Sequence, residues 1–277
     1  METELEKYMS CAMELTKQSS QLIRDRIWSE KKDIQTKSHR HDFVTETDQE
    51  IEKLLITGLS SQFPDHKFIG EETTSSGVKA ELTDKPTWII DPVDGTLNFV
   101  HGYPNVCISI GLAINKEVVL GIISVPVPNL MFSAVKGCGA FLNGNPIHVS
   151  GCKDIKDALL ALELSGAAGV SERIETCKKL VATFLQNAHG VRSAGSAAYN
   201  MATVALGGAD CYFEIGIHAW DMAAGDIIVR EAGGVVIDPS GGKFDIMSRR
   251  VICASSMELA LQVGGMVDQH YPERDDA

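Results

Sequence analysis

One stretch of this 277-residue chain decides the fold: Trp88-Ile89-Ile90-Asp91-Pro92-Val93-Asp94-Gly95-Thr96-Leu97-Asn98-Phe99. Its first three residues are apolar and predict a buried strand, and two carboxylates, Asp91 and Asp94, follow at the end of that strand. The proline fixes the backbone at the corner, and the glycine permits a close turn before Thr96 begins a short helix. The pattern therefore predicts a strand–turn–helix unit that presents both carboxylates at one edge of a sheet.

Paired carboxylates in this setting predict a magnesium site. Mg²⁺ takes oxygen ligands and is usually bound through a few carboxylates together with substrate phosphate. Asp91 and Asp94 could hold one ion, or Asp91 could bridge two, and the Val93 carbonyl could add a ligand. The N–H groups of Gly95 and Thr96 would face a phosphate at a helix N-terminus. The alternative is an ordinary Asp-Pro and Asp-Gly turn, but the five fixed residues of D-P-x-D-G-T occur by chance at a frequency of about 10⁻⁴ in such a chain.

Three other acidic residues fit the same site. Glu71 follows a short strand over 68–70, Asp48 lies in the first turn of a helix, and Asp221 opens a late helix. Taken singly, Asp48 and Asp221 are typical helix-capping acids and Glu71 is a typical loop acid. His218, close to Asp221, is predicted to be a packed or orienting residue.

The remaining sequence shows two different patterns. The first half predicts helices followed by an antiparallel meander, and the second half alternates strands and helices. We expect one unit over 1–277, in which 1–150 carries the D-P-x-D-G-T site and 151–277 carries Glu214 and Asp221. The expected helices cover 5–28, 47–62 (with Thr47 and Glu50 as a capping box), 171–189, 197–206, 222–232 and 257–267. The expected strands cover 68–70, 88–90, 106–114, 118–125, 131–135, 141–149 (around a turn at Asn143-Gly144), 159–164, 191–192, 211–215, 235–237 and 251–254. The polar connections are 31–42, a loop or a weak edge hairpin, and the loop over 73–84.

The net charge and the cysteine content exclude some kinds of partner and indicate the cellular compartment. The formal net charge is −12 and no lysine- or arginine-rich run occurs, so nucleic acid and anionic membranes are not expected partners. Bound divalent cations would let so acidic a protein handle an anionic phosphate. The seven cysteines are odd in number and lack C-x-x-C spacing, which predicts free thiols in the cytoplasm. Neither a signal peptide nor a membrane-spanning run is predicted.

Together these segments resemble the inositol monophosphatase family, within the wider group of lithium-sensitive, metal-dependent sugar phosphatases. The resemblance covers essentially the whole chain. It implies a fold of the mixed α+β and α/β class, arranged as an αβαβα layered sandwich. The matching segments are 42–48, 68–72, the opening stretch 88–99, 192–197, 220–234 and 241–251.

The resemblance implies Mg²⁺-dependent hydrolysis of inositol monophosphate to myo-inositol and phosphate, inhibition by lithium and a homodimer. Two to three ions are implied. Glu71, Asp91 and the Val93 carbonyl would hold the first, while Asp91, Asp94 and Asp221 would hold the second. A third, weaker ion would lie near Glu71 through water.

Further roles follow from the same resemblance. Thr96 and Asp48 would polarise the attacking water, and Glu71 would act with them through the first ion. The implied substrate contacts are Asp94, Gly95, Thr96, Gly195, Ser196, Ala197, Glu214 and Asp221.

Three departures from the family pattern leave every metal ligand in place. Ser165-Gly166-Ala167 stands where the family often has Gly-Ser-Ser, Arg40-His41 replaces a smaller pair, and Asp226 adds a charge to a helix. One alternative is another sugar or nucleotide phosphatase, which would need a basic or aromatic pocket that the sequence does not reveal. A catalytically silent binding paralogue is a second alternative, and the retained carboxylates count against it.

Overall fold

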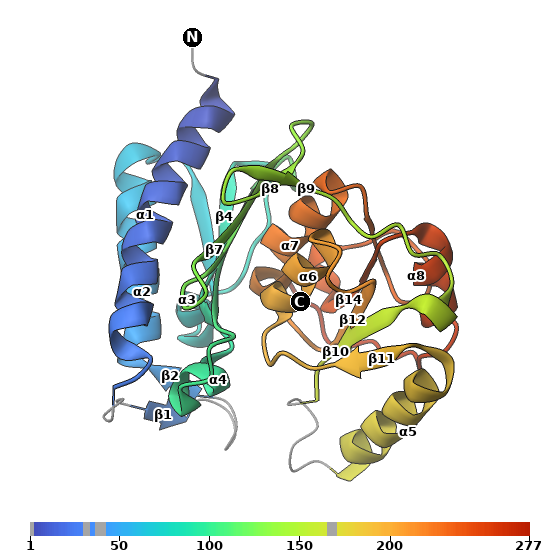
Figure 1. The fold of residues 1–277 in the computed structure, drawn as a ribbon. Coiled ribbons are helices and arrows are strands. Elements are labelled where there is room, and N and C mark those ends of the chain that lie inside the picture. The colour runs from blue at the N-terminus through green and yellow to red at the C-terminus, as the bar shows by residue number, and fades with distance from the viewer. Residues whose placement is uncertain (1–2, 30–33, 37–42, 165–170) are drawn as a thin grey trace.

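Two β-sheets and three layers of helices organise the part of the chain that the computed structural model describes, residues 3–29, 34–36, 43–164 and 171–277. Figure 1 shows the layers edge-on in the order helix, sheet, helix, sheet, helix. This is the αβαβα arrangement that the sequence resemblance implies, and it confirms the predicted fold class. No helix in these ranges is long and apolar enough to cross a membrane.

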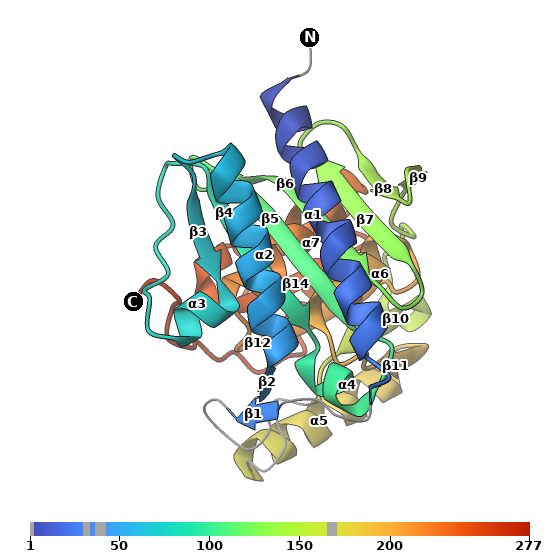
Figure 2. The same cartoon turned by 90° about the vertical axis from the view of Figure 1, so that its left-hand side faces the viewer.

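The large sheet belongs to the first half of the chain. Its strand order follows the sequence, and only the first pair is parallel. Helices α1 (Glu4–Arg26) and α2 (Glu46–Gln62) cover its outer face, as Figure 2 shows face-on. The strands of the large sheet are β3 (Lys67–Gly70), β4 (Thr87–Asp94), β5 (Cys107–Ile114), β6 (Glu117–Val125), β7 (Leu130–Val135), β8 (Ala140–Leu142) and β9 (Asn145–Ile147).

The small sheet belongs to the second half, and its strand order β11-β10-β12-β14-β13 requires crossovers. Strand β10 pairs in parallel with β11 and β12, whereas β14 is antiparallel to both of its neighbours. Helices α5 (Ser171–Asn187) and α8 (Met257–Gly264) cover the outer face. The strands of the small sheet are β10 (Leu159–Leu162), β11 (Gly190–Arg192), β12 (Cys211–Ile215), β13 (Val235–Ile237) and β14 (Arg250–Ala254).

Helices α6 (Ala197–Ala205) and α7 (Ala219–Glu231) lie between the two sheets. Strands β4 and β5 are apolar on both faces because α1 and α2 cover one face and α7 the other. Gly111 and Gly121 let α7 approach closely, since a Cβ on Gly111 would lie 2.6 Å from Ala223 Cβ and one on Gly121 would lie 2.7 Å from the Ala224 carbonyl. This close packing fixes the position of α7 over the large sheet.

Short elements complete the fold near the ends of the strands. Strands β1 (Ile34–Thr36) and β2 (Phe43–Thr45) form an antiparallel pair. The helical turns are α3 (Glu71–Ser75), α4 (Thr96–His101), and the 3₁₀ turns η1 (Ile155–Asp157) and η3 (Ile246–Ser248).

Most expected elements are confirmed within a few residues, and two corrections concern the site. The N-cap of α2 is Thr45, with Asp48 as its capping-box partner, so the predicted pair Thr47 and Glu50 is wrong. Glu50 instead forms an ion pair with Arg26 at 2.6 Å. Strand β4 runs on to Asp94, past the predicted end at 90, because both aspartates still have partners on β5.

Other differences are smaller. The predicted loop over 73–84 begins inside α3, and α7 starts at Ala219, three residues before the expected 222. The seven cysteines all lie in the described ranges and are unpaired, as predicted.

Candidate metal centre

Pairing with β5 and contacts within the turn itself together shape the chain from Asp91 to Thr96. Strand β4 pairs with β5 at Asp91 and again at Asp94, with a bulge between them that turns both carboxylates toward the middle layer. The Val93 N–H donates to Asp91 Oδ1 at 2.9 Å. Gly95 has a φ of 90°, a left-handed conformation that favours glycine, and a Cβ there would lie 3.0 Å from two backbone carbonyls.

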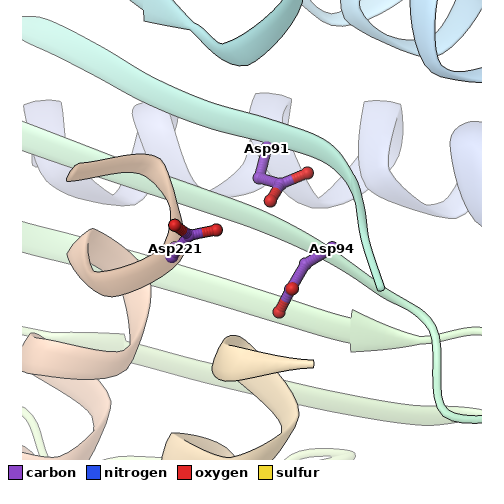
Figure 3. A group of neighbouring side chains, drawn as sticks. All are labelled: Asp91, Asp94 and Asp221. Carbon is purple, nitrogen blue, oxygen red and sulfur yellow. The ribbon is translucent and has the colours of Figure 1, made fainter. Parts of the chain in front are cut away.

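Asp221 joins this pair from the opposite half of the chain. Carboxylate oxygens of Asp91, Asp94 and Asp221 all lie within 4.8 Å of one another, and Figure 3 shows the three side chains converging from β4, its end and the start of α7. Asp91 and Asp94 are only 2% and 7% exposed. Three acidic groups so close together in a buried place are typical of a site for a divalent cation.

Asp221 lies in the first turn of helix α7. His218 is the N-cap, and its backbone N–H donates to Asp221 Oδ2 at 2.6 Å. Ser109 of β5 donates its hydroxyl to the Trp220 carbonyl at 2.9 Å, which ties the same turn to the large sheet. The aspartate is therefore fixed by its own helix cap and by the neighbouring strand.

The protein environment makes these carboxylates hard to ionise without a cation. Burial, followed by the charges of Glu71, Asp94 and Asp221, raises the pKa of Asp91 well above its usual range. Burial and the charge of Asp221 raise the pKa of Asp94 to about 8, and burial raises the pKa of Asp221 to about 6.

The donor set fits a magnesium site. Among the described residues, no lysine or arginine forms an ion pair with any of these three aspartates. Within the described part of the chain, this crowded negative charge has no lysine or arginine partner, which suits a bound cation. All the groups offered are hard oxygen donors, which Mg²⁺ prefers.

Glu71 lies beside Asp91, and a distant helix fixes its position. Its side chain hydrogen-bonds with Asp91 and raises the pKa of that carboxyl. Glu71 is the first residue of α3, whose N-terminal N–H groups at Glu72 and Thr73 each donate to the buried Glu52 of α2 at 2.8 Å. The position of Glu71 therefore depends on Glu52, which the sequence analysis did not single out.

Thr96 and Asp48, the two residues expected to polarise the attacking water, lie next to each other. The Thr96 hydroxyl oxygen lies 3.2 Å from Asp48 Oδ1 and 3.0 Å from the Val93 carbonyl oxygen. Asp48 is fully buried, and its other oxygen accepts from the N–H of Thr45 at 3.0 Å and from the Thr45 hydroxyl. Asp48 is thereby held as a fixed acceptor facing Thr96.

Residues 195–197, which were expected to contact the substrate, already donate hydrogen bonds to two carboxylates of the protein, Asp94 and Glu163. Asp94 accepts the Ser196 hydroxyl at 2.7 Å and the N–H groups of Ala197 and Ala198, at the N-terminus of α6. The Gly195 N–H donates to Glu163 at 2.9 Å. The N–H group of Gly195 thus holds Glu163 and that of Ala197 holds Asp94, so substrate contacts from this turn would use other atoms.

Glu214 lies near the end of β12 and accepts a short hydrogen bond from the Tyr212 hydroxyl. Burial, then the nearby charge of Glu163, raises its pKa well above the usual range. Glu163 was missed because it stands just after β10, with only its position at a strand end as a signal. Arg40, His41 and the departure at 165–167 lie outside the described residues, while Asp226 pairs with Arg230 at 2.7 Å, away from the cluster.

Residues 4–269 match the model of the inositol monophosphatase family. The chain belongs to this family. Inositol monophosphatase 1 of Homo sapiens is 46% identical over 272 residues, covering 97% of this chain and 96% of the relative. Inositol monophosphatase 2 of Homo sapiens is 40% identical over 271 residues, covering 98% and 94%.

Solved structures of the family share the architecture. The IMPase of Thermotoga maritima has a TM-score of 0.83 and 32% identity, with 94% of this chain and 96% of that chain covered. The inositol monophosphatase of Anabaena (Nostoc) sp. PCC 7120 has a TM-score of 0.81 and 28% identity, with 95% and 96% covered. Family membership and the buried aspartate cluster therefore agree on a metal-binding hydrolase.

Proposed function

We propose that this chain hydrolyses inositol monophosphate to myo-inositol and phosphate in a Mg²⁺-dependent reaction. The observation that carries the proposal is the convergence of Asp91, Asp94 and Asp221 within 4.8 Å in a member of the inositol monophosphatase family. The close relatives named inositol monophosphatase support the choice of substrate.

Two to three magnesium ions are part of the proposal. Glu71, Asp91 and the Val93 carbonyl would hold one, and Asp91, Asp94 and Asp221 a second, with a third near Glu71. The Val93 carbonyl has a second lone pair to offer beside its contact with Thr96. When bound, the ions supply charge neutralisation at the phosphate and a lowered pKa for the attacking water.

Thr96 and Asp48 would orient the attacking water. A threonine hydroxyl has one proton, and donating it in a hydrogen bond to Asp48 leaves the Thr96 oxygen free to accept a hydrogen bond from water. Asp48 cannot rotate away, since its other oxygen is held by Thr45. The pair would thus orient the water. As the bond from the water oxygen to phosphorus forms and the ester bond from phosphorus to the inositol oxygen breaks, the water would pass its proton to Thr96 while Thr96 passes its own proton to Asp48.

Glu214 would accept hydrogen bonds from inositol hydroxyls, together with Ser196 and Asp94. Carboxylates are acceptors for vicinal hydroxyls, and Glu214 lies close enough to Asp94 and Asp221 for their charges to raise its pKa. Gly95 and Thr96 would face the phosphate.

A phosphate-release assay on a panel of substrates tests the proposal. Inositol monophosphate, a fructose bisphosphate and a 3′-phosphoadenosine nucleotide should be compared with Mg²⁺ and with a chelator. We expect release from inositol monophosphate that requires Mg²⁺ and falls at high lithium. Preference for either of the other two substrates would favour the broader sugar or nucleotide phosphatase, and no release from any of them would favour a silent paralogue.

Three further features belong to the same proposal: one folded unit over 1–277, a homodimer and a cytoplasmic location. The interleaving of both halves around the middle layer supports a single unit, because α7 packs on strands of both sheets. Seven free cysteines support a reducing compartment. Light scattering on the purified chain would test the dimer.

A further inference from the structure

The last residues of the chain return to the start of α7. Residues 265–277, all described, contain turns and bends without helix or strand. Arg250, almost fully buried, donates to the His270 carbonyl at 2.5 Å and stacks 3.9 Å from the centre of the Tyr271 ring. Arg249 donates to the Glu273 carbonyl at 3.3 Å. These two arginines, at the start of β14, anchor the tail.

The anchored tail places Asp275 against the start of α7. Its side chain is only 5% exposed, and its N–H donates to the Met247 carbonyl at 3.1 Å. Oδ2 accepts the Ala219 N–H at 2.8 Å, the first N–H of α7, and Oδ1 lies 2.6 Å from His218 Nδ1. A carboxylate 56 residues away in sequence therefore supplies the side-chain cap that α7 does not take from its own N-cap residue.

The partners of His218 assign its tautomer. Arg249 Nη2 lies 3.2 Å from His218 Nε2, and a guanidinium can only donate, so Nε2 accepts. The neutral ring then carries its proton on Nδ1 and donates it to Asp275. The ring also stacks on Trp220, with centroids 4.5 Å apart and planes at 9°.

His218 connects Asp275 to the cluster. Its side chain is held by Asp275, and its backbone N–H donates to Asp221 Oδ2 at 2.6 Å. His218 thus contacts Asp275 of the tail through its side chain and Asp221 of the cluster through its backbone N–H. A shift of His218 or of Ala219 would rotate the turn from which Asp221 projects.

We propose that Asp275 is a positioning residue for Asp221, acting through His218 and the first turn of α7. The inference rests on the proposed role of Asp221 as a metal ligand. Residues that orient metal ligands typically change metal affinity or activity by about 10–100-fold when removed. The competing reading is that Asp275 only fastens the tail.

Comparison of Asp275→Ala with Asp276→Ala tests the inference. Both variants remove one acidic side chain from the tail, but Asp276 pairs with Arg274 and forms no hydrogen bond or ion pair with α7, all of whose residues the structure describes. Binding of Mn²⁺ should be measured by electron paramagnetic resonance, alongside the Mg²⁺ concentration that gives half-maximal phosphate release. We expect Asp275→Ala to weaken Mn²⁺ binding about tenfold and to raise the Mg²⁺ concentration for half-maximal phosphate release by the same factor. Asp276→Ala should match the wild type in both measurements. Equal metal affinity in the two variants would overturn the inference.

Two additional variants separate positioning from folding and from the proposed function. In an Asp221→Asn background, Asp275→Ala should cause little further loss of Mn²⁺ affinity, because its effect passes through Asp221. An undiminished tenfold loss in that background would contradict this route. Should Asp275→Ala fail to fold, Asp275→Asn keeps the side-chain volume and one acceptor, and it must still weaken Mn²⁺ binding. The Mn²⁺ measurement holds even if inositol monophosphate proves not to be the substrate.

Discussion

The turn from Asp91 to Thr96 and the first turn of α7 meet at the same cluster but are held in place differently. In the first, Asp91 and Thr96 are held by nearby contacts, because Val93 donates to Asp91 and Thr96 lies against the Val93 carbonyl, whereas Asp94 accepts hydrogen bonds from residues 196–198 of the second half. In the second, Asp221 depends on strand β5 and, through His218, on the C-terminal tail. Asp91 and Thr96 are therefore positioned mainly by contacts close in sequence, and Asp94 and Asp221 by tertiary packing.

This difference predicts how each region responds to change. Substitutions at Asp91 and Thr96 should reduce activity and leave the fold intact, because pairing of β4 with β5 also supports the turn. Substitutions around α7 should reduce metal affinity and stability together, because the same packing that stabilises the middle layer also places Asp221.

The largest effect is expected for Asp91→Asn. This change removes a charge from the centre of the cluster, and metal catalysis contributes several kcal/mol, so phosphate release should fall by about 10³-fold or more. Asp84→Asn, at an exposed position outside the site, is the control and should retain full activity. Circular dichroism should show an unchanged fold for both, and undiminished turnover by Asp91→Asn would refute the metal assignment.

Thr96→Val should have the next largest effect. It removes the hydroxyl that faces Asp48 but keeps a β-branched side chain at the start of α4. General-base assistance contributes about 10²–10⁴-fold, so kcat should fall by about a hundredfold with KM little changed. Thr96→Ser restores the hydroxyl and should recover most of the rate. Equal activity of the valine and serine variants would exclude the proposed water-orienting pair.

Gly121→Ala addresses the packing of α7. A Cβ there would lie 2.5 Å from Ile227 Cγ2 and 2.7 Å from the Ala224 carbonyl, so the helix must shift. Overpacking of this kind costs about 1–3 kcal/mol of unfolding free energy. We expect weaker Mg²⁺ activation in the same variant. Gly242→Ala, where the added Cβ meets only the Ser240 hydroxyl at 3.7 Å, is the control, and identical melting temperatures in the two variants would contradict the packing argument.

The smallest effect concerns pH. The pKa values of Asp91, Asp94 and Asp221 are raised in the folded protein, to about 8 for Asp94 and about 6 for Asp221. The folded metal-free chain then binds more protons than the unfolded chain, so its stability falls as pH rises from about 4 to about 8. Chelator-treated protein should therefore melt at lower temperature as pH rises, and excess Mg²⁺ should remove this trend. A melting temperature that is independent of pH in the chelator would refute the prediction.

The comparison also explains what the sequence could and could not reveal. The D-P-x-D-G-T turn was predictable because its residues support one another over six positions, and the alternation of apolar residues located most strands. The extension of β4 through Asp94 was not predictable, since Pro92 interrupts the pattern while pairing with β5 supports it from outside.

Residues that act over long sequence separations escaped prediction for a physical reason. Glu52, Glu163 and Asp275 look like ordinary surface acids in sequence, yet each accepts backbone N–H groups from a segment far along the chain. The N-cap of α2 was misplaced because Thr45 and Thr47 both precede suitable partners, and only the tertiary position of Asp48 distinguishes them.

The most direct test is a crystal structure with Mn²⁺ that locates the ions by anomalous scattering. We predict a peak contacting Asp91, Asp94 and Asp221 together, which would join the local and the remote halves of the site through one ion. Peaks elsewhere in an active crystal, with none at these three carboxylates, would contradict the account.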